Sequence, residues 1–266
     1  MRAKKSLGQH FLKSKRAIAK IISAAQLAEN DVVLEIGPGR GALTKALLES
    51  GARVIAIEKD SDMIEVLEQM FANEIASRRL QIIHGDILTI DIGPLLQANE
   101  ATNYKLVANI PYYITGEIIR RFLSEVTQPE RMVLLVQKEV ATRIAARDGK
   151  ESILSLSVKA FGTPKLVMTV PARDFAPAPK VDSAILSITN ISHDRLVPDK
   201  ETQFFEIIKR AFSQKRKQLV GTVPPLVSKE DLVDFLIQQK LPVTTRPEEL
   251  DFEDWKHLIN RETSRR

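Results

Sequence analysis

The chain has 266 residues, with 39 Lys and Arg against 34 Asp and Glu, a formal net charge of +5 and no cysteine. This length suits one sizeable core with a small appended domain. The lack of cysteine excludes disulfides and cysteine-ligated zinc, and no apolar run reaches the ~18 residues that a membrane span needs. We therefore expect a cytoplasmic protein without a membrane segment.

The elements predicted in chain order begin with an amphipathic helix over residues 17–27, which places Ile18, Ile21, Ile22 and Ala25 on one face. Apolar strands and amphipathic helices follow it. The strands are predicted at 32–36, 53–58, 80–84, 104–108 and 131–136, and the helices at 42–50, 62–72 and 115–124. Alternation of this kind predicts an α/β fold with a parallel, doubly wound sheet and ligands beyond the carboxyl ends of its strands.

The first of these strands runs into a glycine turn. Residues 32–41 read Val-Val-Leu-Glu-Ile-Gly-Pro-Gly-Arg-Gly, and a helix pattern follows. Gly37, Gly39 and Gly41 leave room for a ligand to approach the backbone, and the helix points its free N–H groups at the same place. The segment is typical of a nucleotide-binding turn.

The next two strands also end in residues suited to a nucleoside. Glu58 closes the strand 53–58 and is placed to accept both hydroxyls of a ribose. Asp86 follows the strand 80–84, where its carboxylate would accept from an adenine amino group while Ile87 lies against the ring. Each acid alone is more typical of a solvated strand end or a helix cap. Ligand-type residues at the ends of successive strands, however, indicate one site.

Two cofactors fit this arrangement. The dinucleotide fingerprint is Gly-x-Gly-x-x-Gly, which cradles a pyrophosphate. Here the order is Glu35-x-Gly37-x-Gly39-x-Gly41, with an acid two residues before the first glycine. This order resembles the first motif of class I S-adenosylmethionine-dependent methyltransferases, whose cofactor carries an ammonium group and no phosphate. We therefore predict S-adenosyl-L-methionine, with a nicotinamide dinucleotide as the alternative.

A proline-containing turn follows the strand 104–108. It reads Asn109-Ile110-Pro111-Tyr112, and the proline stiffens it by fixing its own φ and favouring an extended Ile110. In such a stiff turn the Asn109 amide oxygen and the Ile110 carbonyl have fixed directions, and both can accept hydrogen bonds from an exocyclic amino group. The Tyr112 ring is a stacking surface for a flat base. Such residues also form ordinary strand-to-helix turns, but the glycine turn upstream favours a base site.

The rest of the chain predicts late strands followed by a helical segment. β-branched and apolar residues favour strands at 165–170 and 183–188, which we expect to be antiparallel. From residue 202 onward the pattern is helical, and its apolar stripe is typical of a core face. We therefore predict a catalytic domain over residues 1–190 and a helical C-terminal domain over residues 191–266.

Basic residues gather near both ends of the chain. Residues 1–20 and residues 209–218 each carry several Lys and Arg and no acid. Such clusters are typical of phosphate-binding surfaces, and also of solvated helix faces. Within the second cluster, Lys215, Arg216 and Lys217 are the candidates for contacts with RNA.

Together these features resemble the KsgA-type small-subunit rRNA adenine dimethyltransferases, relatives of the Erm large-subunit rRNA methyltransferases. The matching segments lie at residues 5–12, 35–39, 57–58, 85–86, 109–112, 174–177, 211–219 and 246–250. The resemblance implies a class I methyltransferase sheet of the Rossmann-like type with a small helical domain that binds RNA. It also implies that His10 and Leu12 contact the cofactor and that Phe175 is a second aromatic wall of the base pocket.

One segment departs from the family pattern. After Leu219 the family commonly continues with a polar, basic helix, whereas Val220-Gly221-Thr222-Val223-Pro224-Pro225 stands here. Glycine and the proline pair are expected to interrupt any helix at this point. The departure concerns the expected RNA-facing surface and leaves the methyl-transfer pocket unchanged.

The resemblance implies N6 dimethylation of two adjacent adenines in a loop near the 3′ end of 16S rRNA. The expected substrate is rRNA within the immature 30S subunit, and we expect a monomer. The alternatives are an Erm-type enzyme acting on 23S rRNA, a noncatalytic ribosome assembly factor on the same fold, and an NAD-dependent oxidoreductase. The four histidines are scattered and no Gly-x-Ser-x-Gly elbow occurs, so we expect neither a metal site nor a serine nucleophile.

Overall fold

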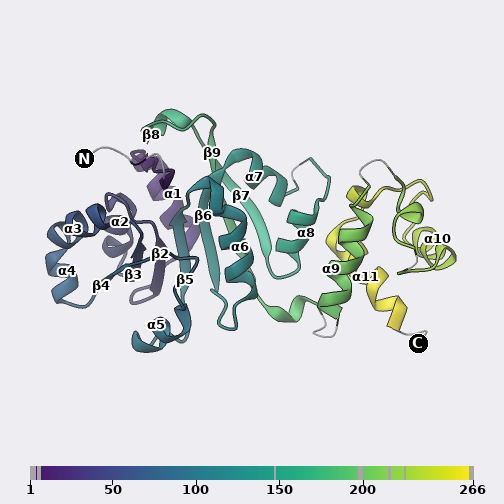
Figure 1. Ribbon diagram of the computed structural model, residues 1–266, viewed down its shortest axis with the longest axis horizontal. Coiled ribbons are helices and arrows are strands. Elements are labelled where there is room, and N and C mark those ends of the chain that lie inside the picture. Colours follow the sequence, from purple (N-terminus) through teal and green to yellow (C-terminus); the bar gives the residue numbers. More distant parts are fainter. Residues whose placement is uncertain are drawn as a thin grey trace. The chain divides into compact units, whose positions relative to one another are not determined.

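A seven-stranded sheet forms the centre of the first part of the chain (Figure 1). The computed structural model describes residue 4 and residues 7–146, 148–196, 200–214, 217–224 and 226–263. The strands stand in the order β4-β3-β2-β5-β6-β9-β7. Their bounds are Val32–Ile36 (β2), Arg53–Glu58 (β3), Leu80–His84 (β4), Lys105–Asn109 (β5), Arg131–Gln137 (β6), Thr163–Val170 (β7) and Ser183–Thr189 (β9).

The inner strands of the sheet are parallel. β2 pairs in parallel with β3 and β5, and the pairs β3–β4 and β5–β6 are parallel as well. β9 runs antiparallel to β6, as expected for a late strand. Because parallel strands share one direction, the carboxyl ends of β2 to β5 meet at one edge of the sheet. The predicted α/β fold is therefore confirmed, and it brings the candidate residues to a single edge.

Helices accompany these strands along the chain. The first helix begins after Ser14, whose hydroxyl caps it, and it buries Ala17, Ile21 and Ala25. This confirms the predicted amphipathic face. The helix itself begins and ends two residues earlier than the predicted range 17–27. The helices of this part are Lys15–Ala25 (α1), Ala42–Glu49 (α2), Ser61–Met70 (α3), Ala72–Ala76 (α4), Ile92–Ala98 (α5), Thr115–Ser124 (α6) and Lys138–Ile144 (α7).

The helix pattern differs from the prediction in two respects. The single helix expected over 62–72 is two helices, because the chain leaves the helical conformation at Phe71, where φ is −116°. The sequence also gave no sign of α5, α7 or a further helix, Ile153–Lys159 (α8). In α5, Gly93 and Pro94 lie in the first turn of the helix, where proline is tolerated.

The chain divides into two compact units. One comprises Met1–Ala141 and Pro164–Ile191, and the other comprises Thr142–Thr163 and Ser192–Arg266. Residues 142–163 thus group with the C-terminal helices, although the predicted catalytic domain ran without interruption over residues 1–190. The physical reason is side-chain packing, since the Phe161 ring stacks on Phe205 at 6.3 Å between centroids. Such contacts leave no trace in local periodicity.

The second unit is helical. Besides α8 it contains Glu201–Ala211 (α9), Lys229–Gln238 (α10) and Phe252–Thr263 (α11). Phe204 and Trp255 are fully buried, which confirms that the apolar stripe after residue 202 is a core face. Between α9 and α10 the described chain makes only the short turn Leu219–Gly221 (η6), as the glycine and prolines predicted.

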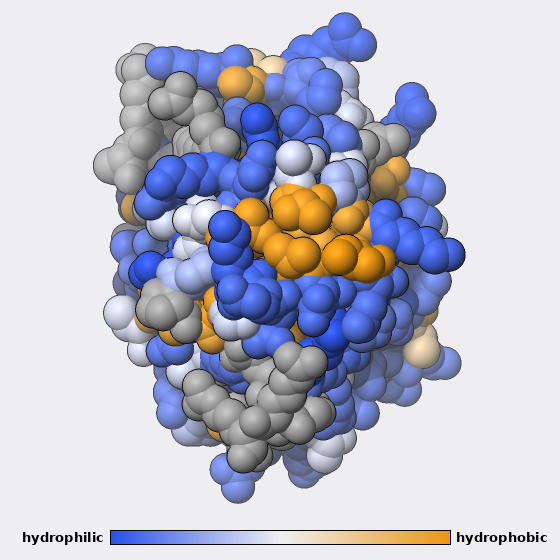
Figure 2. All heavy atoms as spheres, turned by 90° about the vertical axis from the view of Figure 1, so that its right-hand side faces the viewer, coloured by the Kyte–Doolittle hydropathy of each residue, from blue (hydrophilic) through white to orange (hydrophobic). Residues whose placement is uncertain are grey.

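Apolar surface is also visible on the molecule. Figure 2 shows a face on which hydrophilic side chains surround a compact apolar patch. The exposed large apolar side chains of the second unit include Ile237 and Val243. Among the residues that the structure describes, no helix combines the length and apolarity required to cross a bilayer.

Candidate functional site

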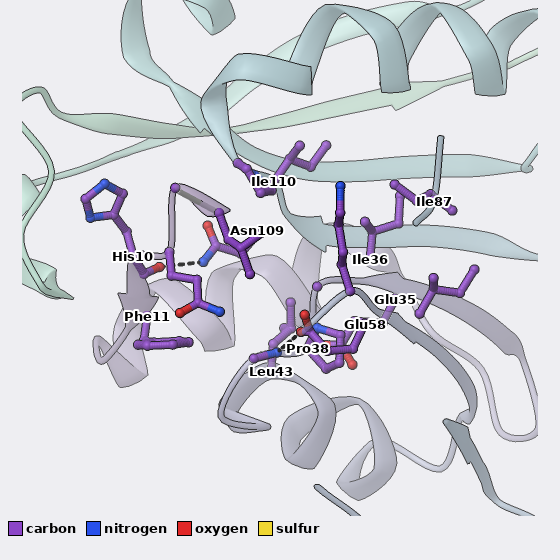
Figure 3. Close-up of a pocket in the computed structure, with 18 of the residues that line it drawn as sticks. His10, Phe11, Glu35, Ile36, Pro38, Leu43, Glu58, Ile87, Asn109 and Ile110 are labelled. Carbon is purple, nitrogen blue, oxygen red and sulfur yellow. Dashed lines mark hydrogen bonds between the residues drawn. The ribbon is translucent and has the colours of Figure 1, made fainter. Parts of the chain in front are cut away.

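A cavity of about 300 Å³ opens at the carboxyl ends of β2, β3, β4 and β5 (Figure 3). It lies within the first unit and is lined mainly by the segments that follow these strands. The predicted residues that line it are His10, Leu12, Gly37, Gly39, Glu58, Asp86, Ile87, Asn109, Ile110 and Tyr112. The tertiary structure therefore collects almost all of the candidate residues around one space.

The glycine turn after β2 has the backbone that its sequence suggests. Gly37, Gly39 and Gly41 have φ angles of +66°, +56° and +75°, in the left-handed region that favours glycine. At Gly39 a Cβ would stand 2.9 Å from the Phe11 ring, and at Gly41 it would stand 2.6 Å from the Phe71 ring. Side chains would therefore both strain this turn and collide with its neighbours.

Glu58 ties the end of β3 to the glycine turn. Its carboxylate accepts the N–H of Gly39 at 3.0 Å and the N–H of Asp60 at 2.8 Å. Burial raises the pKa of the Glu58 carboxyl, and these backbone N–H groups offset part of that rise. Since each carboxylate oxygen can accept two hydrogen bonds, the group is still able to accept from ligand hydroxyls.

Asp86 is held by a lysine that the sequence did not single out. Lys59 Nζ lies 2.7 Å from Asp86 Oδ2, and the N–H of Leu88 donates to Asp86 Oδ1 at 3.0 Å. The ion pair with Lys59, helped by the Leu88 N–H, keeps the pKa of Asp86 below its usual value. Asp86 is therefore an ionised acceptor, and the Arg121 guanidinium binds the carbonyls of Ile87 and Ile90 in the same turn.

The Asn109 amide is oriented by the N-terminal segment of the chain. Asn109 Nδ2 donates to the carbonyl of His10 at 2.9 Å, across a separation of 99 residues (Figure 3). With its amino group engaged in this way, the amide has its oxygen as the remaining acceptor. The neighbouring Ile110 is fixed by its N–H, which donates to the carbonyl of Leu135 at 3.2 Å. The two predicted acceptors, the Asn109 amide oxygen and the Ile110 carbonyl, are thus positioned by different parts of the chain, one by the N-terminal segment and the other by β6.

His10 and Tyr112 stand next to one another at the cavity. Their rings are nearly parallel, with centroids 6.0 Å apart and an angle of 23° between the planes. His10 Nδ1 lies 2.8 Å from the carbonyl oxygen of Pro177, and the Tyr112 hydroxyl lies 2.7 Å from that of Ser183. Burial raises the pKa of the Tyr112 phenol, which is therefore neutral at physiological pH.

Phe175 lies in the core and does not line the cavity. It forms the two-residue strand β8 (Phe175–Ala176), which pairs with β1 (Phe11–Leu12), and Leu12 is its partner in the register. The Phe175 side chain is only 2% exposed. A base could contact this ring only after the loop rearranges, so its role as a second wall stays a prediction. The ring that the structure places beside Tyr112 is that of His10.

Glu35 is a buried acid within the otherwise apolar strand β2, and it lines the cavity. It is 1% exposed, and among the described residues its Oε2 has no hydrogen-bond partner. Burial raises the pKa of Glu35 to about 8; the nearby Thr44 hydroxyl counters this rise, and the charge of Glu58 adds to it. Thr44 Oγ1 itself lies outside hydrogen-bond geometry. An unpaired buried carboxyl of this kind suits a ligand that carries a positive charge.

Two further residues connect the N-terminal segment to the cavity. Gln9 Nε2 donates to Asp60 Oδ2 at 2.7 Å, and Lys4 Nζ lies 2.6 Å from Asp60 Oδ1. Asp60 directly follows the loop of Glu58, so these contacts fix the segment that carries His10. Gln9 stands within the Gly8–Leu12 motif, which was the available signal, whereas nothing local in the sequence pointed to Lys59 or Ser183.

The predicted RNA-binding residues are only partly within the described structure. Lys217 is described and exposed. Lys215 and Arg216 lie outside the described residues, so their part of the prediction has no structural account. Among the residues that the structure describes, no group of three or more His, Cys, Asp or Glu side chains could hold a metal ion.

Comparisons with known proteins agree on one family. The family "Ribosomal RNA adenine dimethylase" matches residues 1–262. The protein named "Ribosomal RNA small subunit methyltransferase A" of Thermosynechococcus vestitus is 41% identical, covering 97% of this chain and 96% of its own. Its counterpart from Dehalococcoides mccartyi (strain CBDB1) is 40% identical, covering 97% of this chain and 88% of its own.

Two solved structures, a dimethyladenosine transferase and a 23S rRNA methyltransferase, are also similar to this chain. The dimethyladenosine transferase from Plasmodium falciparum superposes with a TM-score of 0.78 at 28% identity, covering 96% of this chain and 98% of that chain. The 23S rRNA methyltransferase ErmE superposes with a TM-score of 0.81 at 25% identity, covering 94% of this chain and 98% of that chain.

Proposed function

The chain belongs to the ribosomal RNA adenine dimethylase family, and we propose that it dimethylates the exocyclic N6 of two adjacent adenines near the 3′ end of 16S rRNA. The enzyme is an S-adenosylmethionine-dependent rRNA adenine dimethyltransferase with the class I fold. The observation that carries the proposal is a cavity in which Glu58 and Asp86 stand beside the turn Asn109–Tyr112.

The residues around the cavity suit S-adenosyl-L-methionine. Glu58 offers a carboxylate for the ribose hydroxyls, and Asp86 offers one for the adenine amino group. Gly37 and Gly39 line the cavity without side chains, which leaves the backbone of the turn accessible to a ligand at these two positions. Glu35 contributes a buried carboxyl oxygen that has no hydrogen-bond partner within the described part of the chain, which suits an ammonium group. The cavity therefore offers partners for the ribose hydroxyls, the adenine amino group and the ammonium group of this cofactor.

When bound, the cofactor supplies an electrophilic methyl group on a sulfonium. The contribution of the protein is to prepare the nucleophile, because the lone pair of an adenine amino group is delocalised into the ring. Asn109 Oδ1 and the Ile110 carbonyl accept the two amino hydrogens, which favours a pyramidal nitrogen with a directed lone pair. Positioning and preorganised acceptors of this kind are large terms in catalysis.

No general base is needed for this reaction. Once methylated, the nitrogen carries a positive charge and is acidic enough to lose its proton to water. The Tyr112 ring presents a π face that favours such a cation as it develops. Phe175 joins it if the loop that buries its ring rearranges when RNA binds. The base must leave its stack to enter, so a loop in the RNA is the natural target.

The remaining parts of the proposal concern the partner. The first unit carries the methyl-transfer site, and the C-terminal helical unit binds the RNA, with Lys215, Arg216 and Lys217 on phosphates. The substrate is rRNA within the immature 30S subunit, the enzyme acts as a monomer, and it works in the cytoplasm.

Methyl transfer to isolated substrates tests this proposal. Radiolabelled S-adenosylmethionine is incubated with immature small subunits and, separately, with 23S rRNA, and the labelled nucleoside is identified after nuclease digestion. Dimethyladenosine from the small subunit alone is the expected result. Label confined to 23S rRNA would assign the chain to the Erm-type activity, and the absence of label despite cofactor binding would indicate a noncatalytic assembly factor.

A further inference from the structure

The Tyr112 hydroxyl is held by a serine from a distant strand. Tyr112 Oη and Ser183 Oγ are 2.7 Å apart, and the two residues are separated by 71 positions in the chain. Ser183 is the first residue of β9 and is fully buried, with an exposed fraction of 0%. The hydroxyl of a fully buried serine needs a hydrogen-bond partner, and here the partner is the hydroxyl of Tyr112, a residue that lines the cavity.

The start of β9 is a rigid anchor for this contact. Ser183 stands opposite Gln137 in the antiparallel pairing of β6 and β9. The preceding residue, Asp182, accepts the N–H of Lys138 at its carbonyl at 3.0 Å. Its carboxylate also accepts the N–H of Ala172 at 3.0 Å. Hydrogen bonds from two different segments thus fix the backbone from which Ser183 projects.

Tyr112 itself needs such an anchor. It begins the short turn Tyr112–Ile114 (η2) directly after Pro111, and the local backbone fixes only where its side chain starts. Its ring is half-buried, with His10 across from it at 6.0 Å. A hydrogen bond at the far end of the ring, from Oη to β9, fixes the position of the whole side chain relative to Asn109 and Ile110.

We propose that Ser183 is a positioning residue of the base site, whose hydroxyl holds the Tyr112 ring where the target adenine stacks. This inference rests on the proposed function. Ser183 does not line the cavity, so it acts through Tyr112 alone. The sequence motifs that identify the site do not include this serine, because its contact with Tyr112 exists only in the folded sheet.

A double-mutant cycle tests the inference. The variants are Ser183→Ala, Tyr112→Phe and the two combined, each assayed for kcat and KM with immature small subunits and for cofactor affinity. Loss of one such hydrogen bond should lower kcat/KM about tenfold in each single variant. The combined variant should be no worse than either single variant, because both changes remove the same contact. Cofactor affinity should stay within about twofold of the unmutated value.

Ser187→Ala is the matched control. Ser187 lies on the same strand, four positions along and therefore on the same face, and it is 5% exposed. It does not line the cavity, so its removal should leave kcat/KM unchanged. If Ser183→Ala destabilises the sheet, Tyr112→Phe still tests the inference. It removes the same hydrogen bond by changing Tyr112, which is only half-buried.

Three results would overturn the inference. Turnover by Tyr112→Phe equal to that of the unmutated protein would mean that the hydrogen bond does nothing for catalysis. Multiplicative losses in the combined variant would mean that Ser183 acts independently of Tyr112, and equal losses in Ser187→Ala would indicate a general effect on β9. These outcomes differ from failure of the proposed function, in which the unmutated protein transfers no methyl group to the small subunit, and that failure would overturn both.

Discussion

The two ends of the cavity are built in different ways. At the end formed by β2, β3 and β4, Glu58 accepts the N–H groups of Asp60 and Gly39, 2 and 19 residues away, and Asp86 pairs with Lys59, 27 residues away. At the other end, Asn109 is held by His10 and Tyr112 by Ser183, across 99 and 71 residues. The contacts that hold the cofactor end therefore span far fewer residues of the chain than the contacts that hold the base site.

The largest effect is expected at the base end, from Asn109→Ala. The change removes one of the two acceptors for the adenine amino group, and kcat should fall by about 10² or more. Cofactor affinity should change little, because Glu58 and Asp86 are untouched. Single-turnover methyl transfer and calorimetric binding of S-adenosylhomocysteine measure the two quantities. Asn103→Ala, at an exposed position, is the control, and near-normal turnover by Asn109→Ala would refute its assigned role.

The opposite pattern is expected from Glu58→Gln. The amide keeps the shape of the side chain but places a donor among the N–H groups that the carboxylate accepts, so cofactor affinity should fall by about tenfold to a hundredfold. At saturating cofactor, turnover should largely recover. Calorimetry and initial rates check this, with the exposed Glu65→Gln as the control. A lower kcat at an unchanged cofactor affinity would contradict the division between the two ends.

A smaller effect, on RNA binding and on neither end of the cavity, is expected from changes in the basic cluster of residues 209–218. Replacing Lys215, Arg216 and Lys217 with Gln should weaken RNA binding about tenfold at moderate salt. Each lost phosphate contact should also reduce the steepness of log affinity against log salt by ~0.7, the value for single-stranded nucleic acid. Filter binding over a range of salt concentrations measures the slope. Cofactor affinity should not change, and an unaltered slope would identify the cluster as an ordinary solvated surface.

The smallest expected effect concerns Glu35 and pH. Its pKa of about 8 means that the carboxyl is mostly protonated at pH 7. An ammonium group bound beside it would favour the charged form, so cofactor binding should release up to about one proton. Calorimetry in two buffers of different ionisation enthalpy counts the protons. Glu35→Gln should abolish the release, and equal release in both proteins would exclude Glu35 as its source.

The same pKa shift predicts how stability depends on pH. Because the folded-state pKa of Glu35 lies above its ordinary value of 4.5, its folded form binds more protons than its unfolded form between these values. The free energy of unfolding, measured relative to Glu35→Gln, should therefore fall as the pH rises from about 4.5 to about 8 and stay level above that. Urea denaturation of both proteins at several pH values checks the sign, which an increase with pH would contradict.

Much of the fold and the site could be predicted from local patterns. The strands β2, β3, β4 and β5 lie within one residue of their expected bounds, because apolar runs bounded by turns are a local property. The same holds for the left-handed glycines after β2 and for the carboxylates at the ends of β3 and β4. The helix α5 was missed because a short helix with glycine and proline carries weak periodicity. The break at Phe71 was missed because no glycine or proline marks it in the sequence.

The base end shows where such reasoning stops. The sequence, with its family resemblance, identified Asn109, Tyr112 and Phe175, but it did not reveal that Phe175 is packed in the core while His10 stands beside Tyr112. Nor did it indicate Lys59 as the partner of Asp86. These contacts depend on which loops lie next to one another at the edge of the sheet. The local sequence of a loop does not show which other loop it will contact.

The α/β class, the glycine turn and the acceptor groups that the chemistry requires could be predicted from the chain alone, because each follows from residue type and short-range spacing. Which of these groups meet is a property of the fold, as in the hydrogen bonds of Asn109 with His10 and of Tyr112 with Ser183. It also grouped residues 142–163 with the C-terminal helices. The physical reason is that side chains far apart in the chain become neighbours only when packing of the whole sheet and its helices fixes their distances.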